Sequence, residues 1–175
     1  MTTHPFNPEQ LSSPHCDARE GDDISLLVIH NISLPAGEWG TPHVKALFMG
    51  TLDTSAHPSF EVLSGLKVSA HLFIDRQGHI LQFVPFEKRA WHAGESSFEG
   101  RTCCNDFSIG IELEGSDTTP FTDAQYDALV KATKVIQAGY PKITKERIVG
   151  HSDIAPSRKT DPGPLFDWDR FFRLL

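Results

Sequence analysis

Residues 25–30 have the sequence Ser-Leu-Leu-Val-Ile-His, and this short stretch decides the fold class. Its aliphatic residues form an unbroken run that leaves no polar face. The length of the run and the β-branching of Val28 and Ile29 predict a strand that is buried on both faces. Such strands lie inside sheets that helices cover, so residues 25–29 favour an α/β fold.

Further strands are expected on both sides of this run in the sequence. Residues 68–74 alternate with the period of a strand. The turn residues at 75–78 predict a hairpin whose second strand covers residues 80–84. Two more strands are expected, at residues 108–113 and 147–150.

The clearest helix signal is a capping box formed by Thr122 and Gln125, followed by apolar residues at helical spacing up to Gly139. Two shorter helices are expected, over residues 42–49 and at the C-terminus. The capping residues that we expect for the three helices are Thr41, Thr122 and Asp167.

The chain has 175 residues, which suits one domain. Residues 1–23 are polar and rich in proline, and we expect them to form a loop-rich N-terminal arm. No repeat or linker divides the remainder. The sequence therefore predicts a single α/β domain over residues 1–175, with a central mixed β-sheet flanked by helices. The expected long loops are residues 51–66, 94–106 and 152–165.

Composition and charge exclude several classes of protein. Sixteen basic and 23 acidic residues give a net charge of −7, which argues against nucleic-acid partners and anionic membranes. No apolar run is long enough to span a membrane, and the N-terminus lacks the features of a secretory signal. Cys16, Cys103 and Cys104 show no CxxC spacing and suit a reducing compartment. We therefore expect a soluble, cytoplasmic protein.

Three side chains have the chemistry of a zinc site. His30 follows the expected central strand, His151 follows the strand at 147–150, and Asp161 lies in the loop beyond it. Strand ends of an α/β sheet commonly carry the functional site. Two imidazoles and one carboxylate suit Zn²⁺ with a fourth position left for water. The alternative is structural: a hydrogen-bonded histidine at a strand end, and an aspartate that forms a turn before Pro-Gly.

Glu112 and Lys159 are candidates for catalysis. The period of the strand at 108–113 puts Glu112 on the same face as Glu114, in a functional cleft or on a half-exposed surface. A partly buried glutamate has a raised pKa and can act as a general base. Lys159, two residues before Asp161, could stabilise developing negative charge. Its alternative is a solvated loop lysine.

His71 and His92 are rival ligands, and Trp91 with His92 could line a pocket for a sugar or peptide. Trp91 could equally be a core residue. The other histidines lie in polar surroundings and are predicted to be at the surface; they are His4, His15, His43, His57 and His79.

Several blocks of sequence, taken together, carry a family resemblance. They are Leu26-Leu-Val-Ile-His-Asn-Ile-Ser-Leu-Pro35, Val68-Ser-Ala-His71, Arg89-Ala-Trp-His-Ala-Gly94, Cys104-Asn-Asp-Phe-Ser-Ile-Gly-Ile-Glu-Leu-Glu-Gly115, Thr122-Asp-Ala-Gln-Tyr126, Gly150-His151 and Ile154-Ala-Pro-Ser-Arg-Lys-Thr-Asp-Pro-Gly163. In this order they resemble the AmpD-type N-acetylmuramoyl-L-alanine amidases, within the type 2 amidase and peptidoglycan recognition protein family. The resemblance covers nearly the whole chain.

The resemblance implies the fold of that family and one zinc ion per chain, bound by His30, His151 and Asp161. It also implies that Glu112 and Lys159 are the catalytic pair. The implied reaction is zinc-dependent hydrolysis of the amide between the lactyl group of (1,6-anhydro-)N-acetylmuramic acid and L-alanine. In such enzymes this reaction serves the cytoplasmic recycling of peptidoglycan.

The implied ligands are small soluble anhydro-muramyl peptides, with Asn31, Lys67, Trp91 and His92 as candidate substrate contacts. We expect a monomer. The alternative is a non-catalytic muropeptide-binding module of the peptidoglycan recognition protein type. A periplasmic relative acting on the wall itself is a third interpretation, which the missing signal peptide and the unpaired cysteines disfavour.

The sequence departs from the family pattern at three positions. Ser59 stands where a tyrosine is expected, and Lys67 and Cys103 stand where arginines are expected. Lysine holds a carboxylate only as a point charge, without the two-pronged contact of arginine. The departures therefore predict weaker substrate anchoring while leaving the class of enzyme unchanged.

Overall fold

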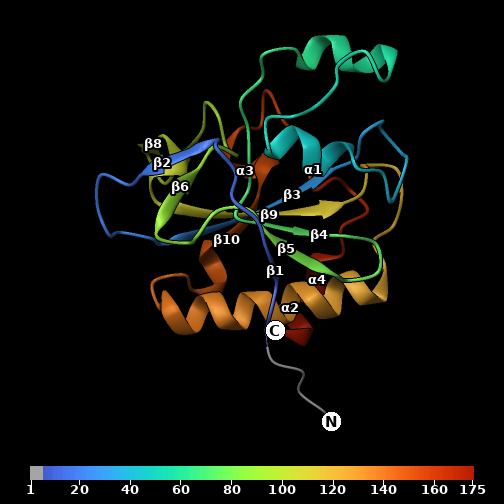
Figure 1. Cartoon of the computed structure of the whole chain (residues 1–175). Helices are drawn as coiled ribbons and strands as arrows, with labels where there is room; N and C mark the ends of the chain where they lie inside the picture. Colours follow the sequence, from blue (N-terminus) through green and yellow to red (C-terminus); the bar gives the residue numbers. More distant parts are fainter. Residues whose placement is uncertain (1–5) are drawn as a thin grey trace.

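The computed structural model describes residues 6–175. Its centre is a six-stranded sheet in the order β1-β5-β4-β9-β3-β10 (Figure 1). β4, β9, β3 and β10 are mutually parallel, while β5 runs antiparallel to β4. The predicted mixed sheet is therefore confirmed. The strands are β1 (Glu9–Gln10), β3 (Leu26–Ile32), β4 (Leu72–Ile74), β5 (Ile80–Gln82), β9 (Ser108–Glu114) and β10 (Ile148–Gly150).

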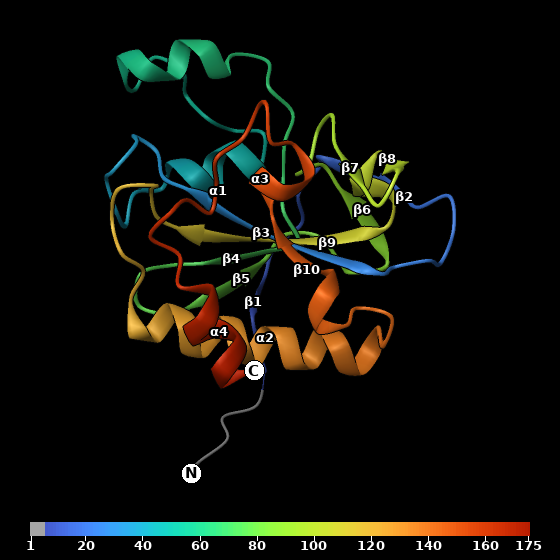
Figure 2. The same cartoon turned by 180° about the vertical axis from the view of Figure 1, so that it is seen from behind.

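Helices cover both faces of this sheet, as Figures 1 and 2 show. α2 and α4 lie on one face, and α1 and α3 lie on the other. Short 3₁₀ turns connect several elements. The bounds are α1 (His43–Phe48), η1 (Pro58–Leu63), η2 (Cys104–Asp106), α2 (Asp123–Gly139), η3 (Lys145–Arg147), α3 (His151–Ile154) and α4 (Trp168–Leu174).

The two faces of the sheet are packed differently. Alternate side chains of β3 and β9, including Ile29 and Ile111, join the large core beneath α2 and α4. The opposite face carries two smaller apolar clusters, one under α1 and one beside α3 that includes Val28. Because strand side chains alternate, His30 and Glu112 lie on this second face. The second face therefore has room for a polar site.

α2 confirms the clearest sequence signal. Thr122 Oγ1 accepts from the backbone N–H of Gln125, and Gln125 Oε1 accepts from the N–H of Thr122, each at 3.1 Å. Gln125 is buried and also donates to the carbonyls of Ile74 and Glu114. The capping box therefore ties the start of α2 to the sheet. Asp167 caps α4 as predicted, accepting from the N–H of Arg170.

Two predictions about local structure near α1 and β4 are wrong. Thr41 does not cap α1, because the hydroxyl of Thr41 donates to the carbonyl of Leu34 and Pro42 occupies the cap position. The strand predicted over 68–74 begins only at Leu72. Before that residue, Ser69 hydrogen-bonds to the backbone of Trp91 instead of to the sheet.

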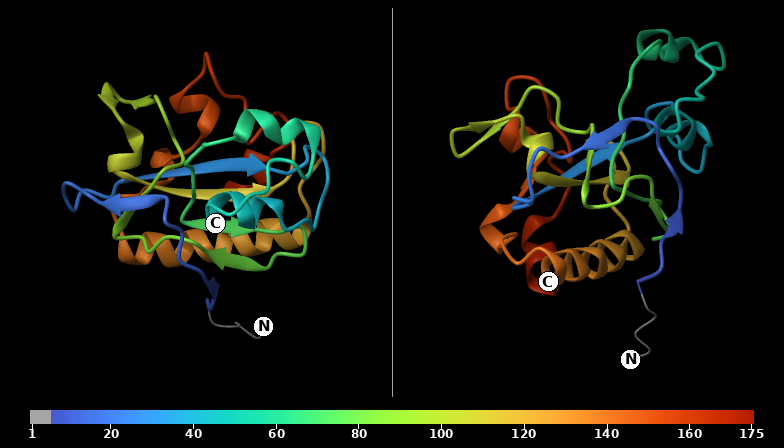
Figure 3. Two further views of the ribbon diagram at one scale, coloured as in Figure 1. Left: turned by 45° about the horizontal axis from the view of Figure 1, so that its top comes forward. Right: turned by 60° about the vertical axis from the view of Figure 1, so that its left-hand side comes forward.

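The predicted loops contain more order than expected. Residues 51–66 include η1 and stand away from the sheet, with Val62 86% exposed (Figure 3). The N-terminal arm supplies β1 and a second short strand, and the loop 94–106 forms a hairpin. These strands are β2 (Cys16–Ala18), which pairs with β6 (Lys88–Ala90), and β7 (Ser97–Phe98), which pairs with β8 (Arg101–Thr102). Residues 1–5 of the arm lie outside the described residues.

The surface assignments of the histidines are confirmed only in part. His79 is exposed, and His43 and His57 are partly exposed. His15 is buried, which overturns its assignment, because its ring stacks on Trp91 and its Nδ1 contacts the carbonyl of Val68 at 2.9 Å. His4 lies outside the described residues. None of the helices in residues 6–175 is long and apolar enough to cross a membrane.

Candidate metal centre and active site

The three predicted metal ligands meet at the carboxyl ends of adjacent parallel strands. His30 lies near the end of β3, and His151 directly follows the neighbouring strand β10. Asp161 reaches them from the following loop, which is joined to α3 by a hydrogen bond from the N–H of Ser152 to the carbonyl of Asp161. Parallel strands place their carboxyl ends at one edge, so the chain order of these residues leads to one site.

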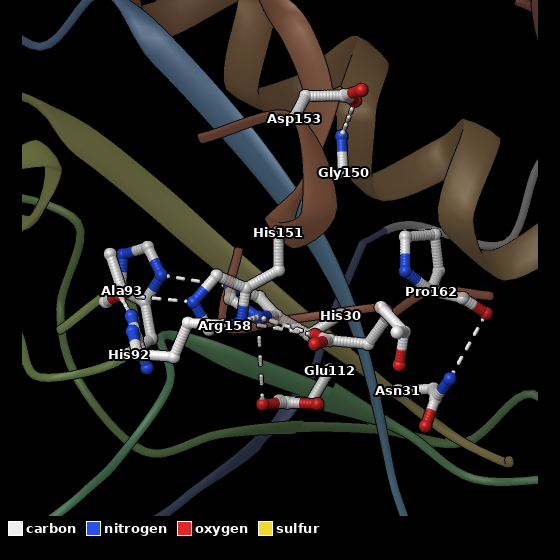
Figure 4. Close-up of polar contacts among 12 residues, drawn as sticks. His30, Asn31, His92, Ala93, Glu112, Gly150, His151, Asp153, Arg158 and Pro162 are labelled. Atoms are coloured by element: carbon white, nitrogen blue, oxygen red, sulfur yellow. Dashed lines mark hydrogen bonds and ion pairs between the residues drawn. The ribbon is translucent and has the colours of Figure 1, made fainter. Parts of the chain in front are cut away.

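The ligand atoms form a nearly equilateral triangle. His30 Nδ1 lies 3.0 Å from His151 Nδ1 (Figure 4). Asp161 Oδ2 lies 3.0 Å from His30 Nδ1 and 3.1 Å from His151 Nδ1. Tetrahedral zinc ligands are separated by about 3.3 Å when the metal bonds are about 2.0–2.1 Å. The triangle is therefore close to one face of such a tetrahedron, and the donor set fits Zn²⁺.

The outer nitrogen of each ring is held by the protein. His151 Nε2 donates to the carbonyl of Ala93 at 2.9 Å, so a neutral His151 has a lone pair on Nδ1. That lone pair faces the carboxylate of Asp161, an arrangement that a cation between them stabilises. His30 Nε2 lies 2.9 Å from His92 Nδ1, and His92 Nε2 lies 3.1 Å from the hydroxyl of Ser108. The rings of His30 and His151 are thus both oriented with Nδ1 toward the triangle.

Electrostatics keep His30 and Asp161 in the protonation states that metal binding needs. Burial lowers the pKa of His30 to about 4, so the ring is neutral at physiological pH. Burial acts to raise the pKa of Asp161, but its close contacts with the rings of His151 and His30 outweigh that effect, and the pKa lies below its ordinary value. A neutral imidazole and an ionised carboxylate are the forms that bind metal.

A polar network fixes the loop that carries Asp161. Asn31 Nδ2 donates to the carbonyl of Pro162 at 3.0 Å and to Asp117 Oδ1 at 2.8 Å. Asp117 Oδ2 accepts from the hydroxyl of Thr160 at 2.5 Å. A Cβ at Gly163, whose φ is +86°, would lie only 2.6 Å from Asp117. The loop therefore packs tightly against the end of β9 on both sides of Asp161.

Glu112 lies beside the triangle, because it is the cross-strand neighbour of His30. Its Oε1 is 3.9 Å from His30 Nδ1. Its Oε2 is buried and, among the residues that the structure describes, has no hydrogen-bond partner. Burial and the charge of Asp161 raise the pKa of Glu112 well above its ordinary value, while Lys159 opposes the shift. The alternative prediction, that Glu112 lies on a half-exposed surface, is wrong because Glu112 is buried.

Lys159 lies on the wall of an open cavity of about 570 Å³ next to the triangle. The cavity is also lined by Asn31 and Asp161, together with Gly115 and Ser116 after β9. The charge of Lys159 lowers the pKa values of both His30 and Glu112, so Lys159 lies within electrostatic reach of each. The two sequence-predicted catalytic candidates and the three ligands are therefore brought together.

The remaining candidates have different positions. His92 is buried behind His30, with both ring nitrogens engaged. His71 is fully buried and accepts from the N–H of Gly110 at Nδ1, so it is no rival ligand. Trp91 is half-buried against His15, and exposed Lys67 borders a cavity of about 180 Å³ that His15 also lines.

Sequence reasoning missed the residues that hold the ligands in place. Asp117 and Asn105 make their key contacts through side-chain oxygens, and Ala93 makes its contact through the backbone. Asn105 and Ala93 do lie within blocks that carry the family resemblance. Asp117, in the loop after β9, carries no comparable signal.

Comparisons with known proteins agree with this geometry. The N-acetylmuramoyl-L-alanine amidase family model matches residues 20–164. The 1,6-anhydro-N-acetylmuramyl-L-alanine amidase AmpD of Enterobacter cloacae is 59% identical over 166 residues, which cover 94% of this chain and 88% of that protein.

Two solved structures extend the comparison. A crystal structure of a selenomethionine derivative of AmpD superposes with a TM-score of 0.94 at 55% identity, covering 98% of this chain and 96% of that one. AmiD from Escherichia coli, in complex with its substrate anhydro-N-acetylmuramic acid-L-Ala-D-γ-Glu-L-Lys, superposes with a TM-score of 0.65 at 34% identity and covers 90% and 60% of the two chains. On this evidence the chain belongs to the N-acetylmuramoyl-L-alanine amidase family, and it is an amidase.

Proposed function

We propose that the protein is a zinc-dependent amidase that hydrolyses the bond between the lactyl group of 1,6-anhydro-N-acetylmuramic acid and L-alanine in soluble muropeptides. The observation that carries the proposal is Oε2 of Glu112, which is buried without a hydrogen-bond partner among residues 6–175 and lies beside the triangle of His30, His151 and Asp161. A buried carboxylate without a hydrogen-bond donor is costly, so its retention suits a group that receives a proton during reaction.

One Zn²⁺ per chain would be held by His30 Nδ1, His151 Nδ1 and Asp161 Oδ2. Bound there, zinc supplies a water of lowered pKa and polarises the scissile carbonyl. The protein supplies the orientation: Ala93 and His92 hold the outer nitrogens of the two rings.

Glu112 is the proposed general base and acid. It accepts a proton from the attacking water and donates it to the amide nitrogen as the C–N bond breaks, which returns the carboxylate to its starting state. The raised pKa of Glu112 brings its proton affinity closer to that needed for both transfers. Lys159 is the proposed stabiliser of the negative charge that develops on the carbonyl oxygen.

The substrate is proposed from the relatives. AmpD of Enterobacter cloacae is named for its action on the 1,6-anhydro sugar, and AmiD was solved with an anhydro-muramyl peptide. The open cavity beside Lys159 has the volume for part of such a ligand. Asn31, Trp91 and Lys67 are proposed substrate contacts. His92 is buried behind His30, which favours a role in supporting the metal ligand His30 instead of a substrate contact.

A cytoplasmic role in peptidoglycan recycling, performed by a monomer, completes the proposal. The net charge of −7 disfavours electrostatic adhesion to an anionic wall polymer. We therefore expect efficient cleavage of small anhydro-muramyl peptides and poor release of peptides from intact murein.

The test combines metal analysis with turnover. The purified chain should contain about one zinc per molecule and should cleave a synthetic anhydro-muramyl tripeptide, releasing the free peptide. The synthetic peptide and intact murein are assayed at equal muramyl-peptide concentration. Equal or faster hydrolysis of intact murein would reject the recycling role, and full turnover after metal removal by a chelator would reject the zinc mechanism.

A further inference from the structure

The two histidines of the triangle are supported by one short segment of chain. His92 Nδ1 lies 2.9 Å from His30 Nε2, and the carbonyl of the next residue, Ala93, accepts from His151 Nε2 at 2.9 Å (Figure 4). Neither His92 nor Ala93 lies in a strand or a helix. The placement of this dipeptide therefore sets the direction of both ligand nitrogens.

The dipeptide is in turn held by a single side-chain oxygen. Asn105 Oδ1 accepts from the backbone N–H of His92 at 3.1 Å and from that of Ala93 at 2.8 Å. Both N–H groups are buried, so their acceptor matters more than one at the surface. One amide oxygen thus fixes the backbone at the point from which both outer nitrogens are held.

The surroundings leave the dipeptide little freedom to find another position. Gly110 faces the ring of His92, and a Cβ at Gly110 would lie 2.5 Å from that ring. The carbonyl of Ala93 also accepts from the guanidinium of Arg158 at 2.7 Å. The backbone carbonyl of Asn105 accepts from the partly buried guanidinium of Arg19 at 3.0 Å, which anchors η2. Asn105 is therefore itself held in place, and its side chain fixes the position of the dipeptide His92–Ala93.

We propose that Asn105 is a positioning residue of the metal centre: its side-chain oxygen fixes His92–Ala93, and this dipeptide fixes the tautomer and orientation of His30 and His151. Residues that orient metal ligands typically change metal affinity by about 10- to 100-fold when they are removed. Asn105 acts on both imidazole ligands at once, through two backbone hydrogen bonds. The inference rests on the proposed metal site and adds a residue to it.

The proposal is tested by zinc affinity, measured on the full chain by competition with a chromophoric chelator. Asn105→Ala removes the acceptor, and Asn105→Asp keeps an oxygen in the same place. Asp75→Ala is the matched control, because Asp75 Oδ1 also accepts from two backbone N–H groups, those of Gln77 and His79, in a turn away from the site. We expect Asn105→Ala to weaken zinc binding by about 10- to 100-fold, and Asn105→Asp and Asp75→Ala to bind as the unmodified chain does.

A second measurement separates positioning from general loss of stability. Melting temperatures are recorded for each variant with the metal removed and with zinc added. Because a ligand raises stability in proportion to the logarithm of its binding constant, the zinc-induced rise should be smaller for Asn105→Ala than for Asp75→Ala, even if both metal-free variants melt earlier.

Two results would overturn the proposal. Zinc binding by Asn105→Ala at the affinity of the unmodified chain would show that the oxygen does not matter to the site. Weak binding by Asn105→Asp, equal to that of Asn105→Ala, would show that the loss has another cause. Failure of the unmodified chain to bind zinc is a different outcome, because it rejects the proposed function itself and the inference with it.

Discussion

Glu112 and Glu114 lie two residues apart on the same face of β9, and both are buried, yet within the described part of the chain only Glu114 has partners for both carboxylate oxygens. The oxygens of Glu114 accept from the backbone N–H groups of Gly40 and Arg76, at 2.6 and 3.0 Å. Oε2 of Glu112 has none within residues 6–175. One strand thus carries a structural glutamate and, two residues before it, a glutamate whose environment opposes its charge.

This contrast predicts opposite effects on the stability of the metal-free protein. Glu112→Gln should raise the free energy of unfolding at neutral pH, because it removes a buried charge that faces Asp161. Glu114→Gln should lower it by about 1–3 kcal/mol, because one backbone N–H loses its acceptor. Chemical denaturation in the presence of a chelator measures both.

The gain from Glu112→Gln should depend on pH in a defined direction. In the folded state the pKa of Glu112 is raised well above its ordinary value of 4.5, so the unmodified protein loses stability as the pH rises through the interval above 4.5. The advantage of Glu112→Gln should therefore be absent below pH 4.5, grow above it and then level off. An advantage that is constant across this range would contradict the raised pKa.

Binding and catalysis should separate in two further variants. Glu112→Gln and Lys159→Met should keep zinc yet each lose about 10²–10⁴-fold in kcat, the usual scale for a general base or an oxyanion stabiliser. The losses should be less than additive in the double variant if both residues act on one transition state. Steady-state kinetics with a defined anhydro-muramyl peptide, together with zinc analysis, give the result. Near-normal turnover in either variant rejects the role given to that residue.

The metal ligands can be separated from neighbouring acids. Asp161→Ala should lose zinc during purification, because one of three protein ligands is removed. Asp153 is the control: it lies on α3 just after His151, is exposed, and accepts from the backbone N–H of Gly150 at 2.7 Å. Asp153→Ala should keep its zinc. Unchanged zinc content in Asp161→Ala would show that Asp161 is not a ligand.

Lys67 offers a prediction of improved binding. Arginine contacts a carboxylate with two parallel hydrogen bonds, whereas lysine acts as a point charge. Lys67→Arg should lower KM by about two- to tenfold, as expected for one added hydrogen bond of about 0.5–1.5 kcal/mol, and leave kcat unchanged. Lys134→Arg, on the outer surface of α2, should change neither constant. An unaltered KM in Lys67→Arg would remove Lys67 from the proposed substrate contacts.

Local sequence signals were sufficient to predict an element where the residues that stabilise it lie within the same segment. The aliphatic run before His30 forms the buried central strand because no polar side chain interrupts it. Thr122 and Gln125 start α2 because each satisfies the backbone N–H of the other. The loop 51–66 shows the limit of such signals, since η1 forms inside a segment rich in turn residues.

The sequence by itself determined the α/β class, the long helix and the identity of the three candidate ligands, because strand ends and donor chemistry can be recognised from neighbouring residues. Only the tertiary structure decided that His15 is buried, that His92 supports His30, and that Asn105 holds the dipeptide behind both histidines. These contacts join residues that are distant in the chain, and their energies depend on burial and on partners that no local pattern contains. The same reason separates Glu112 from Glu114, which share one strand and one face and differ only in what the rest of the fold brings to them.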